Sequence, residues 1–192
     1  MKQQTEKLTR NAQRTLSAFT KALSTTLTQQ SFETVTVNNL CQLANYPRST
    51  FYNYFEDKYD LLNYCFYLIV AEIHLNELAV GDEGQLLLTC FDRLYDLIDQ
   101  HRIYVTKVLK HNRDGYLQTS FTSYAQRIAH KVLADRLTVV QGLPSELVID
   151  HCFATILMVL NWVFIKQNQL TKLDAQMYLV RLYGRPELAK AK

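Results

Sequence analysis

The stretch TVNNLCQLANYPRSTFYNYFEDKYDLL, residues 36–62, carries the strongest local signals in the chain. Thr36 stands where an N-cap belongs, ahead of apolar residues at helical spacing, so we expect a short helix that stops near Asn45. Asn tolerates the left-handed backbone of a tight turn, and Pro47 suits the first turn of a new helix. Two short helices joined by three residues are typical of a helix-turn-helix, whose second helix we place at about residues 47–55.

The two short helices divide their side chains between packing and exposure. A helix-turn-helix packs its first helix on its second, which leaves the outer face of the second free to enter a DNA major groove about 12 Å wide. The side chains expected to pack are Leu40, Leu43, Ala44, Tyr46, Phe51 and Phe55. Those expected to face outward are Arg48, Ser49, Thr50, Asn53 and the hydroxyls of Tyr52 and Tyr54. Since Arg favours guanine and Asn favours adenine, this outward set suits contacts to phosphates and base edges.

The same stretch resembles the helix-turn-helix of the TetR family of bacterial repressors. The positions that match the family pattern in register are Thr36, Leu40, Ala44, Arg48, Thr50, Phe51, Tyr52, Phe55, Lys58 and Leu61-Leu62. The amphipathic segment before it resembles the family's first helix, so the resemblance covers about residues 8–62. Asn45-Tyr46-Pro47 departs from the usual Gly-Val-Ser turn, and Pro47 removes a hydroxyl and a backbone N–H that could meet a phosphate.

The resemblance implies a role for individual side chains. It implies contacts to DNA phosphates from Thr36, Tyr52, Tyr54 and Lys58. It implies base or groove contacts from Asn38, Arg48, Ser49, Thr50 and Asn53. For the tyrosines the alternative is a packing ring whose hydroxyl reaches water, and for Lys58 it is a solvated surface charge.

The remaining sequence also has helical periodicity. The helices expected are at about residues 8–29, 57–77, 86–110 with a break near His101, 116–140, 146–168 and, from a Thr171 cap, 171–183. Residues 81–84 form the clearest internal boundary, and no segment alternates as a strand would. We therefore predict an all-α protein: an N-terminal three-helix domain with the helix-turn-helix (residues 1–62), joined by a long helix to a larger helical domain for dimerisation and effector binding (residues 63–192).

The last two long helices are expected to form a homodimer interface. A small helix-turn-helix gains affinity from two half-sites, and a palindromic operator needs a two-fold symmetric protein. Residues 147–165 are apolar around most of the helix, so this helix must be buried on several sides. By resemblance to the family, the interface residues are Phe153, Ile156, Leu157, Leu160, Trp162, Phe164, Met177 and Val180. The alternative is a core helix within one protomer.

The larger domain is where the family encloses a small-molecule effector. The side chains that could line such a pocket are Phe91, Tyr95, Tyr104, Phe121 and Tyr124, although aromatic residues at helical spacing are more often core. Acidic residues gather in 76–100 and basic residues in 101–136, which suggests either a pocket for an anionic ligand or neighbouring solvated faces; we favour the second. Control by a protein partner rather than a small molecule is the alternative function.

Composition excludes several other classes of protein. With 48% hydrophobic residues, five glycines and three prolines in 192 residues, the chain is typical of a packed helical protein, and its net charge of +3 is too small to indicate nucleic-acid binding by itself. The four cysteines are scattered, so we expect reduced thiols and neither a metal site nor a cofactor.

Known catalytic and targeting signals are also missing from the sequence. The chain has no GxSxG, Gly-rich phosphate loop or HExxH, so we do not expect an enzyme. The N-terminus has no signal-peptide core, and the apolar run 152–165 is short of the roughly 20 residues that a bilayer needs. The sequence thus predicts a cytoplasmic, sequence-specific transcriptional regulator, a ligand-responsive repressor that binds a double-stranded palindromic operator as a homodimer without a membrane partner.

Overall fold

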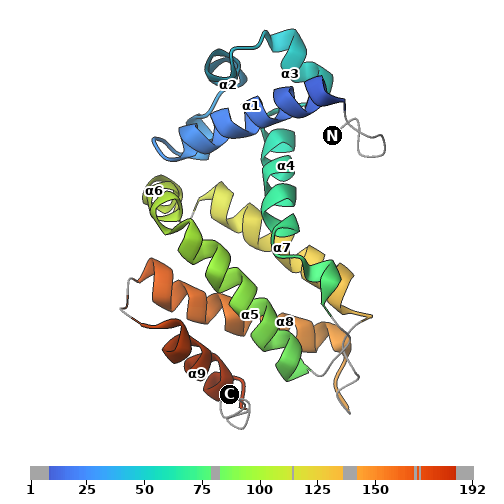
Figure 1. The fold of residues 1–192 in the computed structure, drawn as a ribbon, viewed down its shortest axis with the longest axis vertical. Helices are drawn as coiled ribbons and strands as arrows, with labels where there is room; N and C mark the ends of the chain where they lie inside the picture. Colours follow the sequence, from blue (N-terminus) through green and yellow to red (C-terminus); the bar gives the residue numbers. More distant parts are fainter. Residues whose placement is uncertain are drawn as a thin grey trace. The chain divides into compact units, whose positions relative to one another are not determined.

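The computed structural model describes residues 9–78, 83–113, 115–135, 142–166, 168 and 170–184. Its α-helices are α1 (Arg10–Leu27), α2 (Val37–Ala44), α3 (Arg48–Tyr54), α4 (Lys58–Ala71), α5 (Glu83–Gln100), α6 (Arg102–Asn112), α7 (Tyr116–Leu133), α8 (Ser145–Leu160) and α9 (Lys172–Leu182). Two 3-10 turns, η1 (Phe32–Thr34) and η2 (Leu75–Glu77), and a π-helical turn, η3 (Asn161–Ile165), complete the elements. These residues contain no strand, so the predicted all-α class is confirmed (Figure 1).

The chain divides into two compact units. The first comprises Met1–Ile69 and Lys107–Phe121, and the second comprises Val70–Thr106 and Thr122–Lys192. The predicted division, 1–62 and 63–192, differs from these units in two respects. The structural division falls inside α4, and Lys107–Phe121 returns to the first unit. Helical periodicity reports which face of a helix is buried, and it carries no information on which distant helix covers that face.

The first unit is built on α1. Thr9 caps this helix by accepting a hydrogen bond from the backbone N–H of Ala12 at 3.2 Å. Its inward face presents Leu16, Phe19 and Leu23, each at most 2% exposed, and α2 packs against it. The predicted amphipathic helix at about residues 8–29 is therefore confirmed.

Helix α4 begins as predicted and ends earlier than predicted. The Asp57 carboxylate caps it, since Oδ1 accepts from the backbone N–H groups of Tyr59 at 2.8 Å and Asp60 at 2.9 Å. The sequence placed its end at about residue 77, but the helix stops at Ala71, and His74 adopts a left-handed conformation with φ 54°. The Arg93 guanidinium accounts for this early end, because it donates to the carbonyl oxygens of Ile73 at 3.1 Å and His74 at 2.6 Å.

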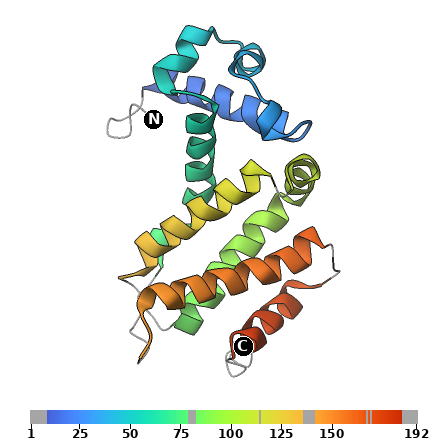
Figure 2. The same ribbon diagram turned by 180° about the vertical axis from the view of Figure 1, so that it is seen from behind.

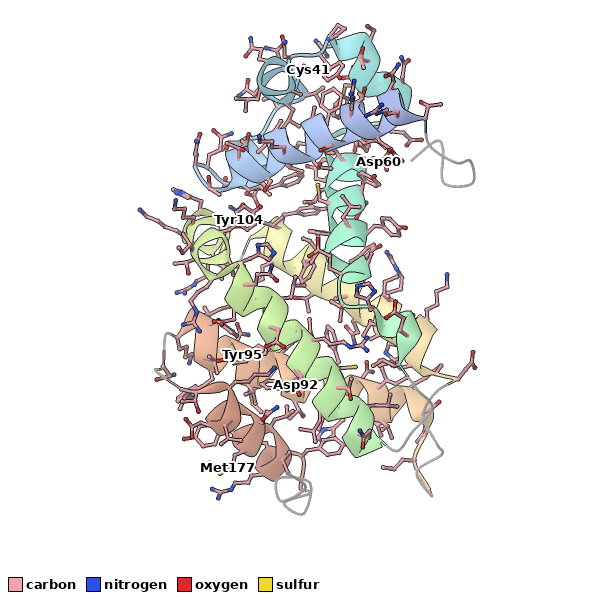
Figure 3. All side chains as sticks on the ribbon, in the orientation of Figure 1. Cys41, Asp60, Asp92, Tyr95, Tyr104 and Met177 are labelled. Atoms are coloured by element: carbon pink, nitrogen blue, oxygen red, sulfur yellow. The ribbon has the colours of Figure 1, made fainter. Side chains whose placement is uncertain are left out.

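The second unit packs α5, α8 and α9 around one apolar core. Its most buried large side chains are Leu87, Phe91, Ile149 and Leu179. Figure 3 places Asp92 and Tyr95 on α5 and Met177 on the neighbouring α9, where the Lys172 ammonium also contacts the Asp96 carboxylate at 2.7 Å. The reverse view in Figure 2 has α8 lying between α7 and α9.

Most of the helix boundaries predicted for this unit are confirmed. The break near His101 separates α5 from α6, and Thr171 caps α9 in a reciprocal pair with Asp174. Helix α7 is described up to Leu133, and the end predicted at about residue 140 lies outside the described residues, as do Gly81 and Asp82 of the predicted boundary. The helix predicted to run to about residue 168 changes to a π-helical turn after Leu160.

The long apolar helix, α8 with η3, is a core element. The segment Ser145–Ile165 is long and apolar enough to cross a membrane by length and composition alone. Seven of its side chains, however, are buried in the core of the second unit: Val148, Ile149, Cys152, Ile156, Val159, Leu160 and Val163. This packing matches the sequence prediction of a buried helix.

Candidate nucleic-acid interface

The turn between α2 and α3 has the geometry of a helix-turn-helix. Thr36 caps α2 by accepting from the backbone N–H of Asn39 at 3.2 Å, as predicted. Asn45 ends α2 in the left-handed conformation, with φ 57° and ψ 44°. Its N–H bonds to the Gln42 carbonyl at 3.2 Å, and the next N–H, of Tyr46, bonds to the Cys41 carbonyl at 3.1 Å. The departure from glycine therefore leaves the turn intact, because Asn is among the few residues that adopt this conformation readily.

Helix α3 follows at once from Pro47. The proline has φ −67° and ψ 155°, and its carbonyl oxygen accepts from the backbone N–H groups of Thr50 at 3.0 Å and Phe51 at 3.3 Å. Pro47 offers no side-chain cap, in agreement with the loss of a hydroxyl that the sequence indicates. The observed α3 spans Arg48–Tyr54, within a residue of the predicted helix.

Aromatic packing holds α3 against α1. The ring of Phe51 lies edge-on to the Phe19 ring, with their centroids 5.2 Å apart, and Phe55 lies 5.4 Å from Phe51. All three rings are completely buried. Tyr46 adds a fourth ring 5.7 Å from Phe19, so the turn itself is fixed to the same core. Aromatic rings packed this tightly give α3 little freedom to rotate, which keeps one face of it outward.

The prediction that Leu43 packs inside the helix-turn-helix is wrong. Leu43 is 59% exposed, although the sequence analysis counted it among the side chains that hold the motif together. On a helix as short as α2 the inward face is centred on Leu40, Cys41 and Ala44, and Leu43 lies on the flank away from that centre. The result is an apolar side chain on the outer surface of the motif.

The predicted contact residues lie mostly on the exposed surface. Thr36 and Asn38 lie at the start of α2, and Arg48, Ser49, Tyr52 and Asn53 lie on α3; all six are exposed. Thr50, Tyr54 and Lys58 are partly buried. The described residues therefore place six of the nine predicted side chains in the open, on the two helices of the motif.

Arg48 and Tyr52 form a pair on the outer face of α3. The guanidinium Nη2 donates to the Tyr52 hydroxyl oxygen at 3.2 Å, and the guanidinium carbon lies 5.8 Å from the centre of the Tyr52 ring. This arrangement uses one of the five guanidinium N–H donors and leaves the phenol O–H proton free to donate elsewhere. The pair can therefore offer several donors to one anionic or base-edge acceptor.

The charge distribution also distinguishes this part of the chain. Residues 7–55 contain five basic side chains and one acidic side chain, Glu33, a net charge of +4 in a protein whose total is +3. No carboxylate occurs between residues 34 and 55. On α1 the exposed bases Arg10, Arg14 and Lys21 border a shallow surface hollow. The net charge of the whole chain is small, but its positive charge is concentrated in the segment that contains the helix-turn-helix.

Lys58 has a structural role that the sequence did not indicate. Its Nζ donates to the carbonyl oxygens of Phe32 at 3.1 Å, Glu33 at 2.9 Å and Val35 at 2.9 Å. The ammonium also lies 4.8 Å from the centre of the Phe32 ring. Because an ammonium has three N–H donors, these bonds use all of them, and the predicted phosphate contact would have to compete with them.

The residues predicted for the dimer interface do not share one surface. Ile156, Leu160 and Val180 are at most 4% exposed within the second unit, so they serve as core there and cannot meet a second chain without rearrangement. Trp162 is 48% exposed, and the half-buried members are Phe153, Leu157, Phe164 and Met177. The sequence analysis missed Leu147 and Met158, which are 56% and 51% exposed on α8. Their spacing of 11 residues, with Trp162 four further on, is the helical signal that could have identified them.

The residues predicted for the effector pocket do not all belong to one unit. Phe91 and Tyr95 are buried in the core of the second unit, and Tyr95 packs on Phe164 with ring centroids 5.0 Å apart. Phe121 belongs to the first unit, where its ring lies 5.2 Å from that of Phe66. Tyr104 and Tyr124 belong to the second unit. Among the described residues, no group of three or more His, Cys, Asp or Glu side chains is placed to hold a metal ion.

A comparison with known protein families finds a match in the region of α2, the turn and α3. Residues 20–65 match the family model described as "Bacterial regulatory proteins, tetR family", and this match includes α2, α3 and the turn. The resemblance stated from the sequence is confirmed over residues 20–65, where this chain is similar to the TetR family of bacterial regulatory proteins.

Solved structures share the fold along nearly the whole chain. A TetR family transcription regulator from Marinobacter aquaeolei VT8 is 17% identical, with a TM-score of 0.57, and the match covers 92% of this chain and 97% of that one. The dihydroxyacetone kinase operon activator DhaS is 21% identical, with a TM-score of 0.52, over 91% of this chain and 97% of that one. At these identities the likeness concerns the fold alone. No curated protein matches the chain in sequence.

Proposed function

We propose that this protein is a cytoplasmic, sequence-specific DNA-binding regulator that represses transcription as a homodimer on a palindromic operator and responds to a small-molecule effector. The observation that carries the DNA-binding part is the outer face of α3. Arg48, Ser49, Tyr52 and Asn53 are exposed there, on a helix fixed from behind by buried aromatic rings and without a carboxylate between residues 34 and 55. Such a face is complementary to the acceptors and negative charge of a major groove.

The contacts divide into two kinds. The phenol of Tyr52 accepts a hydrogen bond from Arg48, so its own proton is available to a phosphate oxygen, and Thr36 at the start of α2 offers a second hydroxyl. Arg48 keeps enough donors to bind guanine O6 and N7. Asn38, Ser49, Thr50 and Asn53 complete the proposed groove contacts, and Tyr54 a further phosphate contact. We leave Lys58 out of this set, because its ammonium donors are engaged within the fold.

The homodimer is supported by an exposed apolar strip on the second unit. Leu147, Met158 and Trp162 lie on one side of α8 and η3, each about half exposed. Leu182 on α9 is 56% exposed as well. Exposed apolar side chains in such a row favour burial against another protein surface. In a homodimer, a second copy of this chain provides that surface. We propose this strip in place of the buried residues Ile156, Leu160 and Val180.

Our proposal for the signal that controls DNA binding rests on the family resemblance. A small-molecule effector is our first proposal, and a protein partner is the second, which the close packing of Phe91 and Tyr95 favours. The two differ in what releases the protein from DNA. In the first case, the small-molecule fraction of a cell extract should release the protein from DNA. In the second case, the protein fraction retained by a dialysis membrane should release it.

The experiment that tests the proposal is a binding titration on duplex DNA from the region upstream of the gene. Fluorescence anisotropy at low salt, where phosphate contacts are strongest, should give saturable binding that an excess of unrelated DNA does not abolish. Arg48→Ala should reduce the preference for that DNA over unrelated DNA, whereas Tyr52→Phe should weaken binding to both. Failure of the wild-type protein to bind at low salt would rule out the proposed function.

A further inference from the structure

A segment from the second half of the sequence completes the DNA-binding unit. The last residues of α6 and the first turn of α7, residues 107–121, group with α1 to α4. They lie against the connection between α1 and α2, which spans residues 28–36 and ends at the Thr36 cap. The contacts at this junction are polar and specific, and they involve two side chains, Asn112 and Glu33.

Asn112 is the most buried polar side chain in the part of the chain that the structure describes, with 3% of its surface exposed. Its Oδ1 accepts from the backbone N–H of Phe32 at 2.8 Å. Its Nδ2 lies within hydrogen-bond distance of the carbonyl oxygens of Leu27 at 3.2 Å, Gln30 at 3.4 Å and Val108 at 3.0 Å. The Asn112 amide thus bonds to the last carbonyl oxygen of α1, to a carbonyl oxygen in the loop after it and to the first N–H of η1. Backbone groups at helix ends lack partners within the helix, and this side chain supplies them.

Glu33 makes the second attachment, in which the side chain belongs to the connection between α1 and α2 and the backbone group belongs to α7. Its Oε1 accepts from the backbone N–H of Tyr116 at 3.0 Å, at the start of α7. The rings of Phe32 and Tyr116 stack beside this bond, with centroids 5.6 Å apart and an interplanar angle of 16°. Gly115 leaves the space that the carboxylate needs, since a Cβ there would lie 3.2 Å from Oε1.

These attachments determine the path of the chain into α2. Phe32, Glu33 and Val35 are also held through their carbonyl oxygens by the Lys58 ammonium. The residue that follows Val35 is Thr36, which caps α2 and leads to the exposed Asn38. Any shift of residues 30–35 is therefore transmitted directly to the N-terminal end of α2.

We propose that Asn112 and Glu33 are positioning residues for DNA binding, which hold the connection between α1 and α2 in the conformation that presents Thr36 and Asn38 to the DNA. Asn112 is too deeply buried to touch DNA, and the Glu33 carboxylate would repel a phosphate. Both act through the backbone of residues 30–35. This inference rests on the proposed function, and it assigns to residues 107–121 a part in DNA binding that their place in the sequence does not suggest.

The test compares four full-length variants. Asn112→Ala removes the amide, Glu33→Ala removes the exposed carboxylate without disturbing the core, and Glu33→Gln restores an acceptor for the Tyr116 N–H. Phe66→Leu is the matched control, because it weakens the contact with Phe121 in the same unit from a residue outside both the connection between α1 and α2 and residues 107–121. Each variant is measured for affinity to the upstream duplex well below its melting temperature, and for amide hydrogen exchange in residues 31–39.

We expect Asn112→Ala and Glu33→Ala to bind DNA about tenfold more weakly, the effect of losing one or two net hydrogen bonds in a dimer, while Glu33→Gln and Phe66→Leu stay within about twofold of wild type. Exchange in residues 31–39 should rise in the two alanine variants only. Equal DNA affinity in Glu33→Ala and Glu33→Gln, or unchanged exchange in both alanine variants, would overturn the inference. Should the wild-type protein bind no DNA, the proposed function fails, and the exchange comparison alone decides whether the two residues hold this connection.

Discussion

The substitution Tyr52→Phe removes one hydroxyl from the outer face of α3 and nothing else. Tyr52 is 41% exposed, and its hydroxyl accepts a hydrogen bond at 3.2 Å from Arg48, which is also exposed, so the folded state loses little. We expect the free energy of unfolding to change by less than about 0.5 kcal/mol, as for other surface substitutions. In the proposed complex the same hydroxyl donates to a charged phosphate, a hydrogen bond worth about 1.5 kcal/mol. Two half-sites double this to about 3 kcal/mol, a loss of about 100-fold in affinity.

The assay is a pair of anisotropy titrations, one on the upstream duplex and one on an unrelated duplex of equal length and salt. Since a phosphate contact carries no sequence information, Tyr52→Phe should weaken both by a similar factor. Arg48→Ala is the contrasting variant and should weaken the upstream duplex more than the unrelated one. Binding of Tyr52→Phe within twofold of wild type, or a loss confined to one of the two duplexes, would refute the assignment of Tyr52 to a phosphate.

Three further predictions concern Lys58, Glu33 and Met158. Lys58→Met should lower the free energy of unfolding by about 2 to 4 kcal/mol in urea titrations, because it removes three hydrogen bonds to backbone carbonyls; unchanged stability together with weaker DNA binding would instead favour a phosphate contact. Hydrogen bonds from its own N–H and from that of Tyr116 lower the pKa of Glu33 below its ordinary 4.5, so the stability that its ionised form adds is present above pH 4.5 and is lost as the pH falls through the lowered pKa. The difference in unfolding free energy between wild type and Glu33→Gln should therefore shrink below pH 4.5, and a constant difference would contradict this. Met158→Glu should give monomers in sedimentation velocity while Ile103→Glu, at a site 75% exposed on α6, leaves the dimer intact; the opposite pattern would place the interface elsewhere.

The helix-turn-helix was predictable because its signals are local. Thr36 caps the helix that begins one residue later, and Asn45 ends that helix with its own backbone conformation. Asp57 and Thr171 are caps of the same kind, and the helix starts at these two positions were predicted correctly. Each of these features depends on residues within four positions in the chain, where spacing and residue type carry the information.

The errors arise where a distant residue decides the outcome. The end of α4 depends on Arg93, which holds the carbonyl of His74 from 19 residues away. The assignment of residues 107–121 to the first unit depends on Asn112, whose partners lie about 80 residues earlier. Periodicity predicts a buried face and does not say which element buries it. The same ambiguity explains Ile156 and Leu160 on α8, because a helix that is apolar on most sides offers no pattern that separates its core face from its interface.

The candidate site was predicted better in its exposed part than in its supporting part. Four of the six exposed candidate residues, Arg48, Ser49, Tyr52 and Asn53, follow from the register of the second helix, whereas Thr36 and Asn38 were implied by the family resemblance. Leu43 and Lys58 do not follow from it, because their environments depend on how α2 and the loop after α1 sit in three dimensions.

The central claim is that α2 and α3 bind operator DNA as part of a two-fold symmetric dimer. Hydroxyl-radical footprinting of the wild-type protein and of an Arg48→Ala, Tyr52→Phe double variant on the upstream DNA tests it most directly. The account predicts protected backbone positions in two patches related by two-fold symmetry, which disappear together in the double variant. Protection that lacks this symmetry, or that survives in the double variant, would contradict it.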